Sequence, residues 1–300
     1  MTPVDGAALN NIAVLDIAAN LGCAELRKND FTLTNVKLAL AGNNQKFRIA
    51  PVTMQLFGAQ AAGTVLADLS GATPYYEVNY SLPQFMVGDF FTLLSPRHIA
   101  AGTMDFSAHL TAHGQTLPEL EQTLAGQISL QGKNLILYDS NLDEQFAKYE
   151  TSQNFNLVDA GAVLFAGPLG LLVTKGFDFA NIAVTSGSSS EIPAAISQWN
   201  IANGVAEAMD VAMRTNQNLL AVKGALDFPN GRFKNLSFAL LDNSGCIKVE
   251  QAVKGAFQHP EIAKPDMFRV LTGAVRTLLQ KLKPDEACAV FYAGSLAAHQ

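Results

Sequence analysis

The residue types best able to do chemistry in this 300-residue chain are histidine, cysteine and a few paired acids. His109 and His113 have the spacing of a zinc-binding HxxxH pair, which requires a helix. The residues around them instead alternate between apolar and polar, as in a strand. Four residues along a strand separate two side chains by about 13 Å, too far to share one ion. We therefore expect two solvent-facing histidines and no metal site.

Other catalytic arrangements are as weakly supported. The acids of Asp143/Glu144 and of Asp285/Glu286 are adjacent in sequence and read as solvated charges near helix ends. The chain has no Gly-rich phosphate loop, no G-x-S-x-G elbow and no catalytic Cys/His signature. We expect a protein that is not an enzyme and needs no cofactor.

The three cysteines, Cys23, Cys246 and Cys288, leave two alternatives open. No CxxC occurs and the spacings suit no zinc site, so the chain has either three buried thiols or one disulfide. A bond between Cys246 and Cys288 would close a long loop and add roughly 4 kcal/mol of stability in the chain-entropy model. It would also imply an oxidising compartment.

Composition narrows the class of protein. Apolar residues make up 49% of the chain and charged residues 15%, which argues against disorder. The net charge of -6 argues against a nucleic-acid partner. No apolar run reaches the roughly 18 to 20 residues of a membrane span. The first 19 residues lack the basic region of a signal peptide.

Short amphipathic strands dominate the first 140 residues. Residues 19 to 30 look polar and loop-like, and strands follow from Phe31 onward. The apolar residues change from odd-numbered to even-numbered positions at Asn35 and again at Pro51, which predicts a β-bulge at each point. Residues 42 to 44 are predicted to form the turn between the two strands. The clearest strand runs from residue 102 to 114, with an apolar even face and a polar odd face.

Helices are predicted near residues 84–94, 116–124, 142–153 and 266–283. Thr116 and Glu119 have the spacing of a capping box. The last helix is the longest and is strongly amphipathic. Together these elements predict a mainly β fold with some α (α+β): an antiparallel sheet of short amphipathic strands, several short helices and one longer C-terminal amphipathic helix.

Two groups of motifs resemble the AsmA family of envelope proteins in Gram-negative bacteria. The ending combines Gly245-Cys246, Gln251, Gly255-Ala256-Phe257, Pro260, Cys288 and Phe291-Tyr292-Ala293-Gly294-Ser295. The middle combines Gly102, Met104, Phe106, Gly114, Leu117, Leu120, Leu124, Gly126, Ile128 and Leu130. Residues 204–215 and 219–241 match less specifically. The resemblance covers residues 100 to 296, whereas residues 1 to 100 match only as repeated strands.

The resemblance carries structural expectations. It implies a disulfide between Cys246 and Cys288, which leaves Cys23 free. It implies a single continuous region over residues 1–300, strand-rich over 1–140 and mixed α/β over 141–300, cut from a longer chain whose N-terminal membrane anchor is missing. It also implies that the sheet curves into a groove with an apolar inside. Six residues are candidates to line that groove: Tyr76, Val78, Tyr80, Met104, Phe106 and Leu110.

The resemblance also carries a functional expectation. It implies a periplasmic part of an inner-membrane-anchored protein that binds phospholipid acyl chains and conducts phospholipid between the inner and outer membranes, with envelope proteins as further partners. The alternative is a non-enzymatic structural or assembly factor for outer-membrane biogenesis, whose apolar faces are fully packed. Phe106→Asp separates the two, because an open groove should tolerate the charge and a closed core should not.

Overall fold

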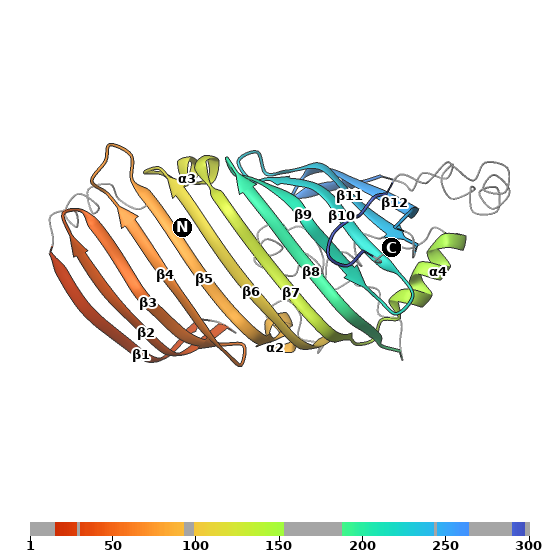
Figure 1. Ribbon diagram of the computed structural model, residues 1–300, viewed down its shortest axis with the longest axis horizontal. Helices are drawn as coiled ribbons and strands as arrows, with labels where there is room; N and C mark the ends of the chain where they lie inside the picture. Colours follow the sequence, from red (N-terminus) through yellow and green to blue (C-terminus); the bar gives the residue numbers. More distant parts are fainter. Residues whose placement is uncertain are drawn as a thin grey trace.

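The computed structural model describes residues 16–28, 31–92, 99–152, 188–242, 245–263 and 290–297. Within these ranges, thirteen strands form one antiparallel sheet in which each strand pairs with its neighbours in sequence (Figure 1). This architecture confirms the prediction of a mainly β, antiparallel fold. None of the described helices is long and apolar enough to cross a membrane.

The strands run hairpin by hairpin from one end of the molecule to the other. The first seven are β1 (Ile17–Lys28), β2 (Phe31–Asn43), β3 (Lys46–Leu56), β4 (Ala59–Asp68), β5 (Tyr75–Met86), β6 (Ala100–His113) and β7 (Ala125–Leu137). The last six are β8 (Ser190–Ala202), β9 (Val205–Arg214), β10 (Leu219–Asp227), β11 (Arg232–Leu241), β12 (Ile247–Ala256) and β13 (His259–Ile262). The long axis of the sheet therefore crosses the strands.

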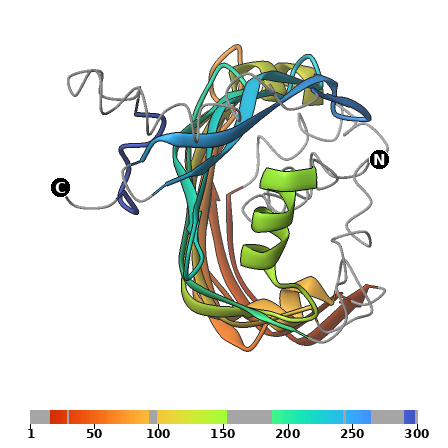
Figure 2. The same ribbon diagram turned by 90° about the vertical axis from the view of Figure 1, so that its right-hand side faces the viewer.

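The sheet is strongly curved. Seen from its end, it has a C-shaped cross-section (Figure 2). Helix α4 (Leu142–Ser152) lies on the concave side, and the C-terminal segment 290–297 lies on the convex side. The two faces of the sheet therefore contact different parts of the chain. The residue pairing between strands shows which side chains belong to each face.

Two β-bulges keep the apolar residues of β2 and β3 on the concave face. Asn35 has a positive φ of 52°, and the β2–β3 register shifts between Thr34 and Lys37. A second shift lies between Ile49 and Val52, around Pro51. Because a bulge inserts one extra residue into the strand, the apolar side chains before and after it point to the same face of the sheet. Both predicted bulges are confirmed.

The prediction of a polar loop over residues 19 to 30 is wrong for most of its length, because β1 extends to Lys28. This strand pairs along its length with β2, for example Leu21 with Leu38. Side chains of β1 are mostly exposed, so the strand does not need the apolar alternation of a buried one. The pairing with β2, which is not visible in local sequence, defines the element.

The three described helices are short. The predicted helix over 84–94 is the five-residue α2 (Val87–Phe91), because Phe85 and Met86 still pair with Met104 and Thr103 in the sheet. Helix α3 (Leu117–Thr123) begins as predicted, with Thr116 Oγ accepting from the Glu119 N–H at 3.4 Å. Helix α4 lies where the third helix was expected. The predicted helix over 266–283 lies outside the described residues.

Buried apolar side chains form two clusters. The larger cluster lies on the concave face and includes Leu142 and Phe146 of α4. The smaller one lies on the convex face of the C-terminal strands, where Phe291 and Tyr292 pack over Leu219, Ala221 and Ala239. The C-terminal part of the sheet is therefore packed on both sides.

Candidate functional site

The candidate site is built from two rows of side chains that cross the concave face. Row A joins eleven strands, β1 to β11, through consecutive register partners. Its members are Ala19, Leu40, Ile49, Val65, Val78, Leu110, Gly126, Ile201, Ala206, Leu226 and Phe233. No member is polar or charged, so an apolar path crosses most of the sheet.

Row B runs beside row A over nine strands. Its members are Leu21, Leu38, Val52, Gly63, Tyr80, Ala108, Ile128, Trp199 and Ala208. Its polar groups are the phenol of Tyr80 and the indole N–H of Trp199, which donates to Ser197 Oγ at 2.8 Å. Burial raises the pKa of Tyr80, which favours its neutral form. Row B therefore widens the apolar path without adding charge.

One row on the convex face over the same strands is mainly polar. It consists of Lys37, Thr53, Ala62, Ser81, Ser107, Ser129, Gln198 and Asp210. Along β6 from residue 103 to 113, the odd residues are mostly exposed and the even residues are buried or half-buried, which confirms the predicted alternation of this strand. Over β2 to β7 the sheet is thus apolar on its concave face and mainly polar on its convex face, whereas the convex face of the C-terminal strands carries the smaller apolar cluster.

The structure brings all six candidate groove residues to the concave face. Val78 and Leu110 are partners in row A, and Tyr80 belongs to row B. Tyr76 lies in the next row, opposite Ala112, and these four candidates are half-buried. Met104 and Phe106 differ, because each is only 8% exposed and belongs to the larger core cluster. Four candidates are therefore accessible on this face, and two are packed by protein.

Exposure changes along the two rows. The members of both rows on β1 to β6 are half-buried, except for Leu21, which is 57% exposed. On β8, Trp199 and Ile201 are each 2% exposed. We call the row A and row B residues on β1 to β6 the open part, and the concave residues of β8 to β12 the closed part. The boundary falls at β7, where Gly126 is half-buried and Ile128 is buried.

Aromatic side chains form a cluster at the α2 end of the first strands. The ring of Phe57 lies 6.2 Å from those of Phe31 and Phe85, and 5.6 Å from that of Phe90. Phe90 also packs against Phe91 at 5.6 Å. Edge-to-face contacts of this kind stabilise a rigid aromatic cluster.

The convex face of β4 to β6 carries a hydrogen-bonded polar network. Tyr75 Oη donates to Glu77 Oε2 at 3.1 Å, and Asn79 Nδ2 donates to Glu77 Oε1 at 2.9 Å. These bonds, with a smaller contribution from His109, lower the pKa of Glu77. His109 Nδ1 lies 2.5 Å from Asn79 Oδ1. The network lies on the convex face and does not include residues of row A or row B.

The histidines follow the expectation from the strand. His109 and His113 are both exposed on the odd face of β6, and the ring of His113 packs 4.9 Å from that of Tyr75. Across the described ranges, no three His, Cys, Asp or Glu side chains are grouped so as to hold a metal ion.

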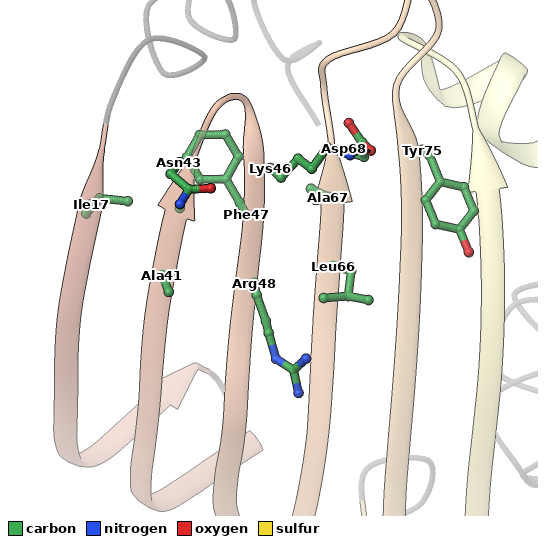
Figure 3. A pocket seen from close by; sticks show the side chains of 11 residues that line it. Ile17, Ala41, Asn43, Lys46, Phe47, Arg48, Leu66, Ala67, Asp68 and Tyr75 are labelled. Carbon is green, nitrogen blue, oxygen red and sulfur yellow. Dashed lines mark ion pairs between the residues drawn. The ribbon is translucent and has the colours of Figure 1, made fainter.

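A hollow of about 460 Å³ lies at the β2–β3 hairpin end of the first strands (Figure 3). Two neighbouring rows line it, one with Ala41, Arg48 and Leu66, the other with Asn43, Lys46, Asp68 and Tyr75. Ile17, Gly42, Phe47 and Ala67 of the intervening row also line it, but no member of row A or row B does. Lys46 pairs with Asp68 at 3.0 Å. This hollow is therefore separate from rows A and B.

The cysteines can be placed only in part. Cys23 is a free, exposed cysteine, as expected. Cys288 lies outside the described residues, so its bond to Cys246 stays a prediction. Cys246 forms an antiparallel bridge with Val290, two residues after Cys288, which brings the two motifs together.

Sequence reasoning missed the partner of the Phe-Tyr-x-Gly-Ser ending. Tyr292 Oη donates to Asp210 Oδ1, and the Ser295 N–H donates to Asp210 Oδ2 at 3.0 Å. Burial and the Asp210 hydrogen bond raise the pKa of Tyr292 to about 12. Lys223 Nζ lies 4.9 Å from the Phe291 ring centroid. Asp210 lies 82 residues from Tyr292, and no local signal in β9 indicates this partner.

Comparison with known proteins gives one match. The model of the AsmA family matches residues 3–211, which is more than half of the chain. The matched range includes the N-terminal strands, which resembled the family only as repeats, and ends before the Gly245–Ser295 motifs. No curated protein and no solved structure matches the chain.

Proposed function

Because the chain belongs to the AsmA family, we propose that it is a periplasmic part of an inner-membrane-anchored protein that binds phospholipid acyl chains and conducts phospholipid between the inner and outer membranes. One observation carries this proposal. Rows A and B present a continuous apolar surface across six strands, half-buried except at the exposed Leu21, on the concave side of a curved sheet.

The dimensions suit an acyl chain. Neighbouring strands lie about 4.8 Å apart, so the five intervals from β1 to β6 span about 24 Å. Each methylene that leaves water for this surface contributes about 0.8 kcal/mol. An acyl chain laid across the strands would contact one apolar residue per strand in each row. Its headgroup would remain in water on the open side of the sheet.

The uniformity of the rows suits movement as well as binding. No charged side chain interrupts row A or row B, so a chain that advances by one strand exchanges one apolar contact for another. Binding energy then changes little along the path. We propose a passive role without catalysis. The protein provides an apolar surface, and the part of the lipid that it recognises is the acyl chain.

Lipid analysis of the purified protein tests the proposal. We expect organic extraction followed by mass spectrometry to recover phospholipid, and we expect denatured protein to retain none. A folded protein that carries no phospholipid, even after incubation with phospholipid vesicles, would contradict lipid binding.

A second function is favoured by the closed part. There the concave residues are buried by protein, as a structural or assembly factor for outer-membrane biogenesis would require throughout. The half-buried open part argues against that alternative. Failure to recover lipid, combined with loss of folding when a charge enters the open part, would support it.

A further inference from the structure

The hollow at the β2–β3 hairpin end lies directly beside row A. Four of its lining residues, Ile17, Gly42, Phe47 and Ala67, are register partners on β1 to β4. Each lies two residues along its strand from the row A member of that strand, and two residues of a strand span about 7 Å. These four residues are half-buried, like the neighbouring members of row A. A ligand in the hollow would therefore also be within reach of row A.

The rows on either side of these four residues bring charge to the hollow. Arg48 belongs to one row, and Lys46 and Asp68 belong to the other. Because β2 ends at Asn43 and β3 begins at Lys46, the hollow lies at the rim of the sheet, and residues of both faces line it. Its volume of about 460 Å³ is within the range of small-molecule sites, roughly 300 to 1,000 Å³. The hollow thus combines an apolar side, next to row A, with charged groups.

Two of the three charges in the hollow neutralise each other. Lys46 Nζ lies 3.0 Å from Asp68 Oδ2. The other carboxylate oxygen, Asp68 Oδ1, accepts from the Ser70 N–H at 3.0 Å and from the Ser70 hydroxyl at 2.5 Å. These Ser70 bonds, followed by the contact with Lys46, lower the pKa of Asp68 to about 2. Asp68 is therefore ionised at neutral pH and balances the charge of Lys46.

Arg48 carries the charge that is not balanced. It is exposed, and it has no ion pair within the part of the chain that the structure describes. Its side chain is directed along the strands and away from the Lys46–Asp68 pair (Figure 3). Glu77, two strands away in the row of Arg48, accepts hydrogen bonds from two neutral side chains. Two cations and one acid line the hollow, so its net formal charge is +1, in a chain whose net charge is -6.

We infer that this hollow is a headgroup site, in which Arg48 binds the phosphodiester of a phospholipid whose acyl chain lies on row A. This inference rests on the proposed function and adds a second recognised group to it. A guanidinium presents parallel N–H donors that match two phosphate oxygens. The single negative charge of a phosphodiester balances the net charge of the hollow. Because Arg48 and Lys46 are exposed, a headgroup bound there stays in contact with water.

Two lipids with identical acyl chains isolate the contribution of the headgroup. Dioleoylphosphatidylglycerol carries a phosphodiester and no other charge, whereas dioleoylglycerol is uncharged. The full chain would be incubated with each lipid in micelles of the same nonionic detergent and separated by gel filtration, and the retained lipid would be measured by mass spectrometry. A free phosphate ion shares the chemistry of the headgroup, so inorganic phosphate is the third probe, with its binding followed by phosphorus NMR.

We expect the unsubstituted chain to retain several-fold more phosphatidylglycerol than dioleoylglycerol. Arg48→Gln removes the charge, so it should lower the retention of phosphatidylglycerol to the level of dioleoylglycerol, whose own retention should not change. Arg48→Lys keeps the charge but loses the paired donors, and it should give an intermediate value. Lys37→Gln is the control, because it removes an exposed cation of β2 that does not line the hollow, and it should change neither lipid. Melting temperatures would verify that all variants are folded.

The outcomes separate this inference from the proposed function. If the folded, unsubstituted chain retained neither lipid, the proposed function would be overturned, and the inference with it. If it retained both lipids equally, or if Arg48→Gln lowered both to the same extent, the inference would be overturned and acyl binding would stand. If Arg48→Gln lost inorganic phosphate but retained phosphatidylglycerol as before, the hollow would be a site for free phosphate, which would overturn its assignment to a lipid headgroup.

Discussion

At the scale of single residues, burial separates positions that share one face. Val78 and Phe106 both point to the concave side, yet Val78 is half-buried in the open part and Phe106 is packed in the core cluster. A charge at the first position can reach water, whereas a charge at the second cannot. The sequence pattern treats both as members of one apolar face, and only the surroundings distinguish them.

We therefore expect opposite results from two charge substitutions. Val78→Asp should leave the free energy of unfolding nearly unchanged and reduce bound phospholipid. Phe106→Asp should lower the free energy of unfolding by several kcal/mol, in contrast to the tolerance expected for a fully open groove. Urea denaturation and lipid extraction would measure both effects. Ser107→Asp, on the exposed convex face of β6, is the control and should change neither.

Tyr292 gives a second prediction at this scale, through pH. Its pKa in the folded protein is raised to about 12, above the usual value of 10.0. A raised pKa means that the neutral phenol stabilises the fold, and this contribution is complete below pH 10 and lost as the pH rises through 12. Tyr292→Phe should lower the free energy of unfolding at pH 7 by about 1 to 3 kcal/mol, because Asp210 loses a donor.

The comparison of the two proteins across pH isolates this residue. Other tyrosines also ionise in this range, so both proteins should lose stability above pH 10, and the unsubstituted protein should lose more. Denaturation curves at pH 7, 10 and 12 would measure the difference. A constant difference across the three would show that the Asp210–Tyr292 hydrogen bond does not stabilise the fold in the way described.

At the scale of elements, close strand pairing depends on glycine at one point of row A. Gly126 has a φ of 131°, and a β-carbon there would overlap the carbonyl oxygen of His109 on β6. Gly126→Ala should therefore disturb the β6–β7 pairing and lower the melting temperature strongly. Gly22→Ala is the control, since its β-carbon would meet only ordinary contacts. Equal melting temperatures for the two variants would contradict this account.

The C-terminal motifs supply another prediction for an element. We expect Cys246 and Cys288 to form a disulfide, because the family resemblance implies it and the Cys246–Val290 bridge brings the flanking segments together. In protein purified without reductant, an alkylating agent should modify Cys23 alone, and reduction should expose two further thiols. Intact mass would count them. Modification of all three cysteines in native, unreduced protein would exclude the bond.

At the scale of the whole molecule, the local sequence pattern predicted which face of a strand is apolar. The location of the candidate site, in contrast, depends on how strands that are distant in sequence pair with one another. The alternation of β6, the bulges at Asn35 and Pro51 and the start of α3 were all readable, because each depends on neighbouring residues. The assignment of β1 failed because an exposed edge strand lacks the alternation. Rows A and B depend on register between many strands, and the Asp210–Tyr292 contact joins distant segments. Neither has a signature in any single stretch of sequence.

The strict order of the strands also affects how the molecule comes apart. Each strand contacts its two neighbours in sequence, so stability is a sum of local hairpin terms, as in repeat proteins. Loss of β1 removes one interface and leaves the next strand as the new edge. Unfolding is therefore expected to start at the exposed β1 end and advance hairpin by hairpin toward α4. Amide hydrogen exchange should be fastest in β1 and slowest in β8 to β11. The surface that is open to ligand is then also the least stable part of the fold.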